Sequence, residues 1–111
     1  MINGYIGIDS NRAKKFGFIS DKFTEVSYLW KKDNFIIISF IESKERGNFK
    51  KLVDNIISQN YGVKIPTPLG RMQEIVVRNN YKHTMVDGYD VWVLEAKKQS
   101  GLKLRRDYEK I

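Results

Sequence analysis

Residues 35–66 of this chain read FIIISFIESKERGNFKKLVDNIISQNYGVKIP. In the first segment, Phe35–Ile41, apolar side chains fall on both faces of an extended chain. A strand with two apolar faces is typical of the centre of a sheet that is covered on both sides. We therefore expect Phe35–Ile41 to be a central strand.

The segment after this strand has the periodicity of an amphipathic helix. Its apolar residues are spaced three and four apart, and they are Phe49, Leu52, Val53, Ile56 and Ile57. Asn48 is the expected N-cap, because its side-chain oxygen can accept from an amide of the first turn. Gly62 is the expected end of the helix, and the strand Val63–Ile65 follows. A strand, a helix and a strand in this order predict a right-handed crossover between two parallel strands.

The residues before position 35 predict further strands. Tyr5–Ile8 and Lys15–Ile19 flank the polar turn Asp9–Arg12. Glu25–Trp30 has strand character and is followed by the predicted turn Lys31–Asn34.

The residues after position 66 predict a second helix and a hairpin. Thr67 can cap the helix and Pro68 suits its first position. Its buried stripe would contain Leu69, Met72, Ile75 and Val76. Asp87-Gly88 is a strong hairpin signal, and it would join strands at Tyr81–Val86 and Tyr89–Leu94.

These elements predict one α+β domain at residues 1–96. It would hold a mixed, mostly antiparallel, twisted sheet with a central strand–helix–strand crossover. The chain length of 111 residues is that of one domain. Residues 97–111 carry six basic and two acidic side chains, a net charge of +4, and we interpret them as a basic C-terminal tail.

Composition limits the chemistry that the chain can perform. It contains no cysteine, which excludes disulfides, thiolate metal sites and cysteine nucleophiles. Its one histidine, His83, cannot form a metal cluster alone, so no metal site is expected. The net charge of +7 favours a polyanionic partner, which could be nucleic acid, a phosphorylated cofactor or an acidic protein surface.

Hydropathy predicts no membrane segment. The longest apolar run, Phe35–Ile41, is too short to span a bilayer. The start, MINGYIGIDS, lacks the charged-then-apolar order of a signal peptide. We therefore expect a cytoplasmic location and no membrane partner.

The order of elements, with several short motifs, resembles the GNAT superfamily of N-acyltransferases without its first two helices. The motifs are the loop and helix start SKERGNFKKL at 43–52, the strand end Lys64–Pro68, the helix bearing Met72, and Asn80-Tyr81 where the family commonly has Gly-Phe. The resemblance covers Phe35–Glu95, and it looks particularly like small GNAT-like proteins encoded by bacteriophages. It implies a truncated GNAT-like fold.

The resemblance also implies a site. In the family, amides of the glycine-containing loop and of the helix start hold the pyrophosphate of acyl-CoA, as helix N-termini can. Here that implies acetyl-CoA bound by Lys44, Arg46, Gly47, Asn48 and Phe49. A carboxylate near the end of the central strand could be the catalytic base, and Glu42 is the one in place, with Glu45 as the second candidate. The tyrosine that many members use as general acid falls at Val76, which is a departure from the family.

Two functions remain open from the sequence. The first is an acyl-CoA-dependent N-acyltransferase, phage-encoded and acting in the host cytoplasm, that acetylates an amine on a protein, a nucleobase or a small molecule. The second is a non-catalytic GNAT-like module that binds nucleic acid or an acidic host protein surface through the basic tail, as an inhibitor would. Loss of the first two helices would leave one sheet face open, which favours a homodimer.

Overall fold

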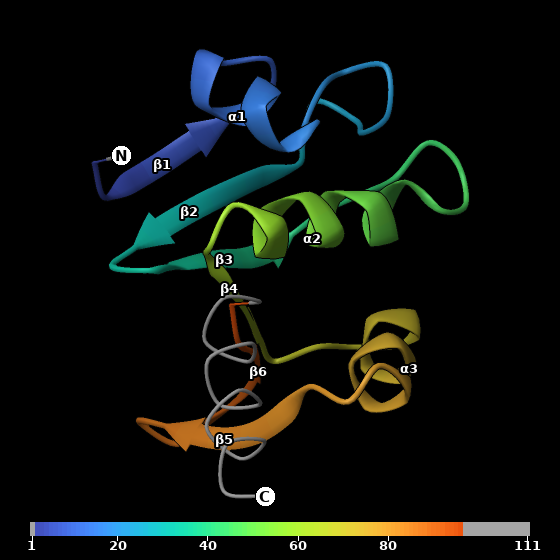
Figure 1. Cartoon of the computed structure of the whole chain (residues 1–111). Helices are drawn as coiled ribbons and strands as arrows, with labels where there is room; N and C mark the ends of the chain where they lie inside the picture. Colours follow the sequence, from blue (N-terminus) through green and yellow to red (C-terminus); the bar gives the residue numbers. More distant parts are fainter. Residues whose placement is uncertain (1, 97–111) are drawn as a thin grey trace, which may run out of the picture.

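The sheet is organised around the strand that the sequence marks as central. In the computed structural model, which describes residues 2–96, six strands pair in the order β1-β2-β3-β4-β6-β5 (Figure 1). The third of these is β3 (Phe35–Phe40), and it pairs in parallel with β4 (Gly62–Pro66). The other neighbouring pairs of this sheet are antiparallel. The predicted α+β class, the central strand and the mostly antiparallel sheet are confirmed.

The crossover between the two parallel strands is also confirmed. It is made by α2 (Asn48–Ser58), whose inner side buries Leu52, Val53 and Ile56 against the sheet. The helix ends before Gly62, because the chain leaves its last turn at Gln59 and reverses at Asn60, where φ is 76°. Gly62 instead begins β4.

The predicted strand Lys15–Ile19 is wrong, because this part of the chain forms a short helix. α1 (Asn11–Phe16) follows β1 (Gly4–Gly7), and Ser10 caps it by accepting from the Ala13 amide at 3.1 Å. Ala13 and Phe16 face the core one helical turn apart. Gly17, with φ of 79°, ends the helix in the left-handed conformation that glycine adopts most readily.

The third predicted strand begins later than expected, and the turn after it is shorter. β2 covers Tyr28–Lys32, so Lys31 lies in a strand and not in a turn. Lys31 is buried, and its ammonium donates to the Asn3 side-chain oxygen at 3.0 Å and to the Asp33 carbonyl. A buried cation with such partners is tolerated, and sequence periodicity does not reveal them.

The second predicted helix starts three residues after Pro68, its predicted first residue. α3 covers Arg71–Arg78, and its N-cap is Gly70 in place of Thr67. The Thr67 amide donates to the Asp90 carbonyl at 2.8 Å, which ties residue 67 to the neighbouring strand and delays the helix. Asp87-Gly88 does join β5 (Lys82–Val86) to β6 (Tyr89–Leu94), as predicted, with both residues at positive φ.

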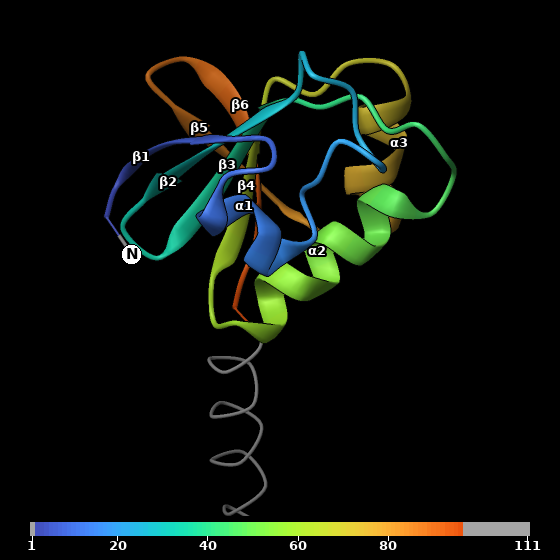
Figure 2. The same cartoon turned by 90° about the horizontal axis from the view of Figure 1, so that it is seen from above.

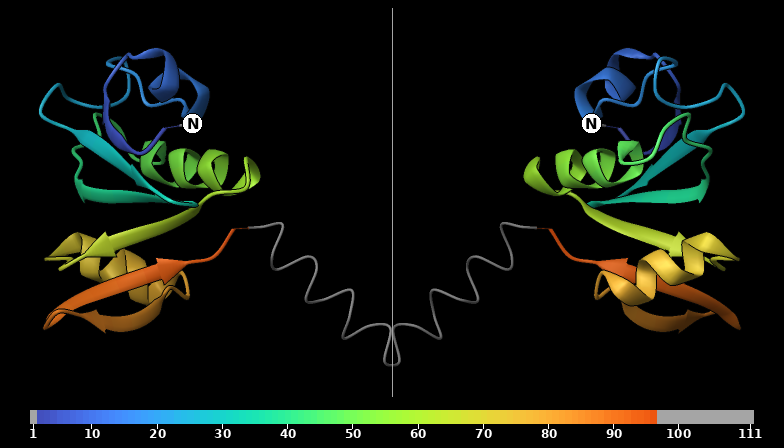
Figure 3. Two further views of the ribbon diagram at one scale, coloured as in Figure 1. Left: turned by 90° about the vertical axis from the view of Figure 1, so that its left-hand side faces the viewer. Right: turned by 90° about the vertical axis from the view of Figure 1, so that its right-hand side faces the viewer.

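The helices of the described residues all lie on one side of the sheet (Figures 2 and 3). Ile36 and Ile38 of β3 are buried on that side, whereas Phe35 and Ile37 on the other side are partly exposed. The expectation that β3 is covered on both sides is therefore wrong for residues 2–96. No helix in this range has the length and apolar character needed to cross a membrane. The predicted tail, 97–111, lies outside the described residues.

Replacing Ile38 by aspartate should unfold the domain. Ile38 is 2% exposed, and an unpaired carboxylate there should lower the free energy of unfolding by roughly 3–5 kcal/mol. Ser39→Asp is the matched control, because Ser39 follows on the same strand and is exposed. Urea denaturation followed by circular dichroism measures both. Similar denaturation midpoints for the two variants would show that β3 is not central to stability.

Candidate functional site

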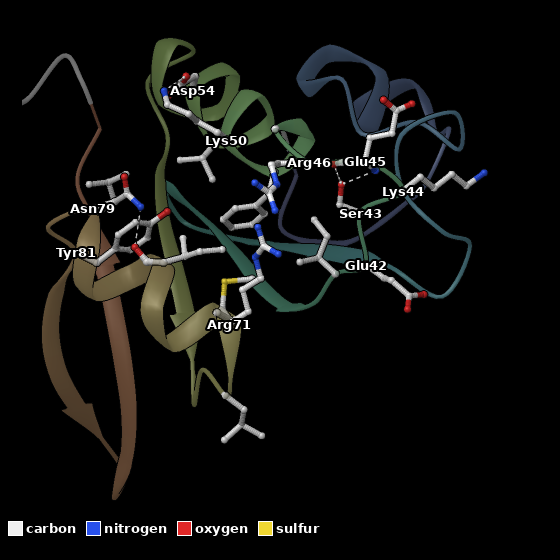
Figure 4. Close-up of a pocket in the computed structure, with 18 residues that line it drawn as sticks. Glu42, Ser43, Lys44, Glu45, Arg46, Lys50, Asp54, Arg71, Asn79 and Tyr81 are labelled. Carbon is white, nitrogen blue, oxygen red and sulfur yellow. Dashed lines mark hydrogen bonds and ion pairs between the residues drawn. The ribbon is translucent and has the colours of Figure 1, made fainter.

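A cleft of about 780 Å³ opens between α2 and α3 at the edge where β3 and β4 end (Figure 4). Parallel strands end at the same edge of a sheet, so the segments that follow β3 and β4 meet there. One wall is the loop at 41–47 with the first turns of α2, and the other is α3 with Leu69. Tyr81 and Leu94 also line the cleft.

The first turn of α2 leaves backbone donors open at the mouth of this cleft. Gly47 is the N-cap with φ of 94°, and it has no side chain to cap the helix. The Asn48 amide donates to the Glu45 carbonyl at 3.4 Å, and the Lys51 amide makes the first helical bond to Gly47. Within residues 2–96, the amides of Arg46, Gly47, Phe49 and Lys50 have no acceptor. Such open amides at the positive end of a helix dipole attract anions.

Two arginines face each other across the cleft. Arg46 comes from the loop and Arg71 from the start of α3, and both side chains point into the space between the helices (Figure 4). Neither forms an ion pair with any residue of the described range. Lys50 also lines the cleft, but its ammonium is paired with Asp54 at 3.0 Å. Within residues 2–96, Arg46 and Arg71 are therefore two cations that point into the cleft and could meet a ligand.

The loop at 42–48 is held in place by the N-terminal third of the chain. The Lys44 amide donates to the Lys22 carbonyl at 2.8 Å, and the Asn48 side-chain amide donates to the same carbonyl at 3.0 Å. The Glu42 amide donates to the Ser27 hydroxyl at 2.7 Å. Asn48 is thus the first residue of the helix and an anchor for the loop, so its prediction as N-cap is wrong.

The predicted catalytic residue, Glu42, is oriented away from the arginines (Figure 4). Its carboxylate is exposed and accepts from the Thr24 hydroxyl at 2.9 Å. Lys44 also points away from the cleft interior. The structure therefore brings Arg46, Gly47 and Phe49 together at the cleft mouth, with the Phe49 side chain packed on the core. It does not direct Glu42 or Lys44 at the same point.

Tyr81 is a cleft residue that sequence reasoning did not identify as functional. Its side chain is 6% exposed, and burial, followed by the nearby Asp54 carboxylate, raises its pKa to about 12. The hydroxyl is therefore protonated at physiological pH and is available as a hydrogen-bond donor. Arg71 was also missed. The predicted parallel pair of strands could have indicated it. Parallel strands end at the same edge, so a basic residue that follows the strand Val63–Ile65 lies near the loop that follows Phe35–Ile41.

Comparisons with known proteins identify no relative. No protein-family model matches the chain, and no curated protein or solved structure shows significant similarity to it.

Titration of Tyr81 should lower the free energy of unfolding as pH rises from 10 toward 12. The fold raises its pKa from 10.0 to about 12, so the protonated form is favoured in the native state. The contribution is fully present below pH 10 and is lost as pH rises toward 12. Between pH 9 and pH 11, wild type should lose about 1 kcal/mol more unfolding free energy than Tyr81→Phe. Urea midpoints measure this. Tyr89→Phe, at an exposed position, should track wild type.

Proposed function

We propose that the chain is a GNAT-like N-acyltransferase that binds acyl-CoA, acetyl-CoA in the simplest case, in the cleft between α2 and α3. One observation carries the proposal: two arginines that have no ion-pair partner within residues 2–96 stand beside amides that have no acceptor there, at the edge shared by two parallel strands. The strand–loop–helix unit at β3 and α2 supports it, because the resemblance to the family rests on that unit.

The start of α2 is suited to the diphosphate of acyl-CoA. A diphosphate is bound best by several hydrogen-bond donors that are not already engaged with acceptors of the protein. The open amides of Gly47 and Phe49 supply fixed donors, and Arg46 and Arg71 can make charge-assisted bonds from either side of the cleft. No side chain at Gly47 blocks the approach, and an added Cβ there would meet no atom within 4 Å, so the backbone lies open to a ligand.

Acyl transfer in this cleft would rely on positioning and on one donor. The nitrogen lone pair of the acceptor amine attacks the thioester carbonyl carbon, the C–S bond electrons leave with sulfur, and the nitrogen proton passes to solvent. Tyr81, with a pKa of about 12, is a weaker acid than a thiol. It therefore stabilises developing charge by hydrogen bonding and keeps its proton. Glu42 would have to leave Thr24 and turn inward to act as the base.

Both arginines should be necessary for tight binding of CoA. Arg46→Ala and Arg71→Ala each remove one charge-assisted contact, worth about 1.5–3 kcal/mol, so CoA affinity should fall roughly ten- to a hundredfold. Both residues are exposed, so the melting temperature should change little. Isothermal titration with CoA measures the affinity of each variant.

The matched control is Lys44→Ala, which removes the same charge from the same loop at a side chain that points away. It should bind CoA within about twofold of wild type. Pantetheine, which lacks the diphosphate, should bind equally to wild type and to the arginine variants. If Arg46→Ala bound CoA like wild type, the diphosphate assignment would be withdrawn. Release of the CoA thiol from acetyl-CoA in the presence of an amine acceptor distinguishes acyl transfer from cofactor binding. If CoA bound but no thiol were released, the chain would be a binding module and not an enzyme.

A further inference from the structure

The side of the sheet that faces away from the helices carries one continuous row of side chains. Each residue of the row is paired by register with the next one on the neighbouring strand. From β1 to β5 the row is Tyr5, Trp30, Ile37, Lys64, Val93 and Lys82. The left view of Figure 3 looks onto this side, where the strands lie in front of α3. The row is aromatic at one end and basic at the other.

The aromatic end is a cluster of three partly exposed rings. Tyr5 stacks on Tyr28 with ring centroids 5.9 Å apart, and it meets Trp30 edge-on at 6.4 Å. Tyr5 is 59% exposed and Trp30 is 45% exposed. Partly exposed rings that pack against one another are a platform on which flat ligands can stack.

The basic end begins next to a fourth ring. Phe35 lies against Gly62 so closely that a Cβ there would come within 2.5 Å of the ring, and the Lys64 ammonium sits 4.3 Å from the centroid of that ring. Lys82 is exposed, two strands further along. Adjacent strands lie about 4.8 Å apart, so Trp30 to Lys64 and Lys64 to Lys82 are each roughly 10 Å across the sheet. Lys32 adds a third ammonium beside Phe35.

No acidic side chain on the six described strands opposes these lysines. Asp90 is the one acidic residue in those strands, and it lies on the helix side, where its carboxylate contacts His83 at 2.7 Å. Within the strands, the open face therefore combines stackable rings with lysines that no strand carboxylate opposes.

We propose that this face binds single-stranded nucleic acid, with bases stacked on Trp30 and Tyr5 and phosphates at Lys64 and Lys82. Aromatic platforms beside a basic track are how proteins hold single strands without reading sequence. A second copy of the chain fits less well than a polyanion, because each copy carries a net charge of +7. The same charge argument favours a polyanion over the tail at 97–111, whose net charge is +4. The inference does not depend on acyl-CoA binding.

The test compares face variants of the full chain by anisotropy of labelled oligonucleotides. Probes are a twelve-residue oligothymidine, its oligouridine equivalent and a duplex of the same length. Trp30→Ala and Tyr5→Ala should each weaken single-strand binding roughly 5- to 150-fold. Trp30 fluorescence should also be quenched by both single strands, and the duplex should bind more weakly because its bases are already stacked. Circular dichroism checks that the exposed substitutions leave the fold intact.

Two lysine pairs supply the matched electrostatic control. Lys64→Gln with Lys82→Gln should reduce the slope of log affinity against log salt by about 1.4. Lys14→Gln with Lys51→Gln removes the same charge from exposed positions on α1 and α2, and it should leave the slope unchanged. Equal slopes for the two pairs, or wild-type affinity in Trp30→Ala, would assign binding to another surface and overturn the proposal. The proposal would also be overturned if the chain bound no oligonucleotide and instead formed a dimer that Trp30→Ala dissociates. Sedimentation equilibrium measures the dimer.

Discussion

The parallel pairing of β3 with β4 is the constraint on which the rest of the molecule depends. Two parallel neighbours cannot be joined by a tight turn, so the chain must cross the sheet, and α2 is that crossing. The pairing places Ile36 beside Val63 on the same side of the sheet, where α2 covers both. Burial of such side chains stabilises the domain by about 1.5–3 kcal/mol each.

The same pairing creates the cleft. Both strands end at one edge, so α2 and α3 begin side by side, and the residues at their starts converge although they are far apart in the sequence. Arg46 and Arg71 are brought together in this way. Their mutual repulsion is one reason why an anion would be held there, because a ligand between them relieves it.

The parts of the fold with strong, long periodicity could be predicted from the sequence, and the parts set by distant contacts could not. The stretch at 35–66 has an apolar pattern in both its strand and its helix. α1 was missed because it has six residues, and because Phe16 and Phe18, two apart and both buried, mimic a strand. Within the site, Gly47 was recognised from its place between strand and helix. The orientation of Glu42 and the anchoring of Asn48 depend on Thr24 and Lys22, which no local pattern connects to them.

The lateral edges of the sheet have a consequence for behaviour at high concentration. In the part of the chain that the structure describes, β1 and β5 are the edge strands, and no neighbouring strand pairs with their outer sides. Such edges invite other chains to add as extra strands. β1 has four residues and is bounded by glycines, which leaves little template for addition. β5 has five, begins with Lys82, and carries Met85 and Val86 exposed at its other end. Aggregation of this domain, where it occurs, would therefore start at the far end of β5, and a charged residue at Val86 would act as a gatekeeper.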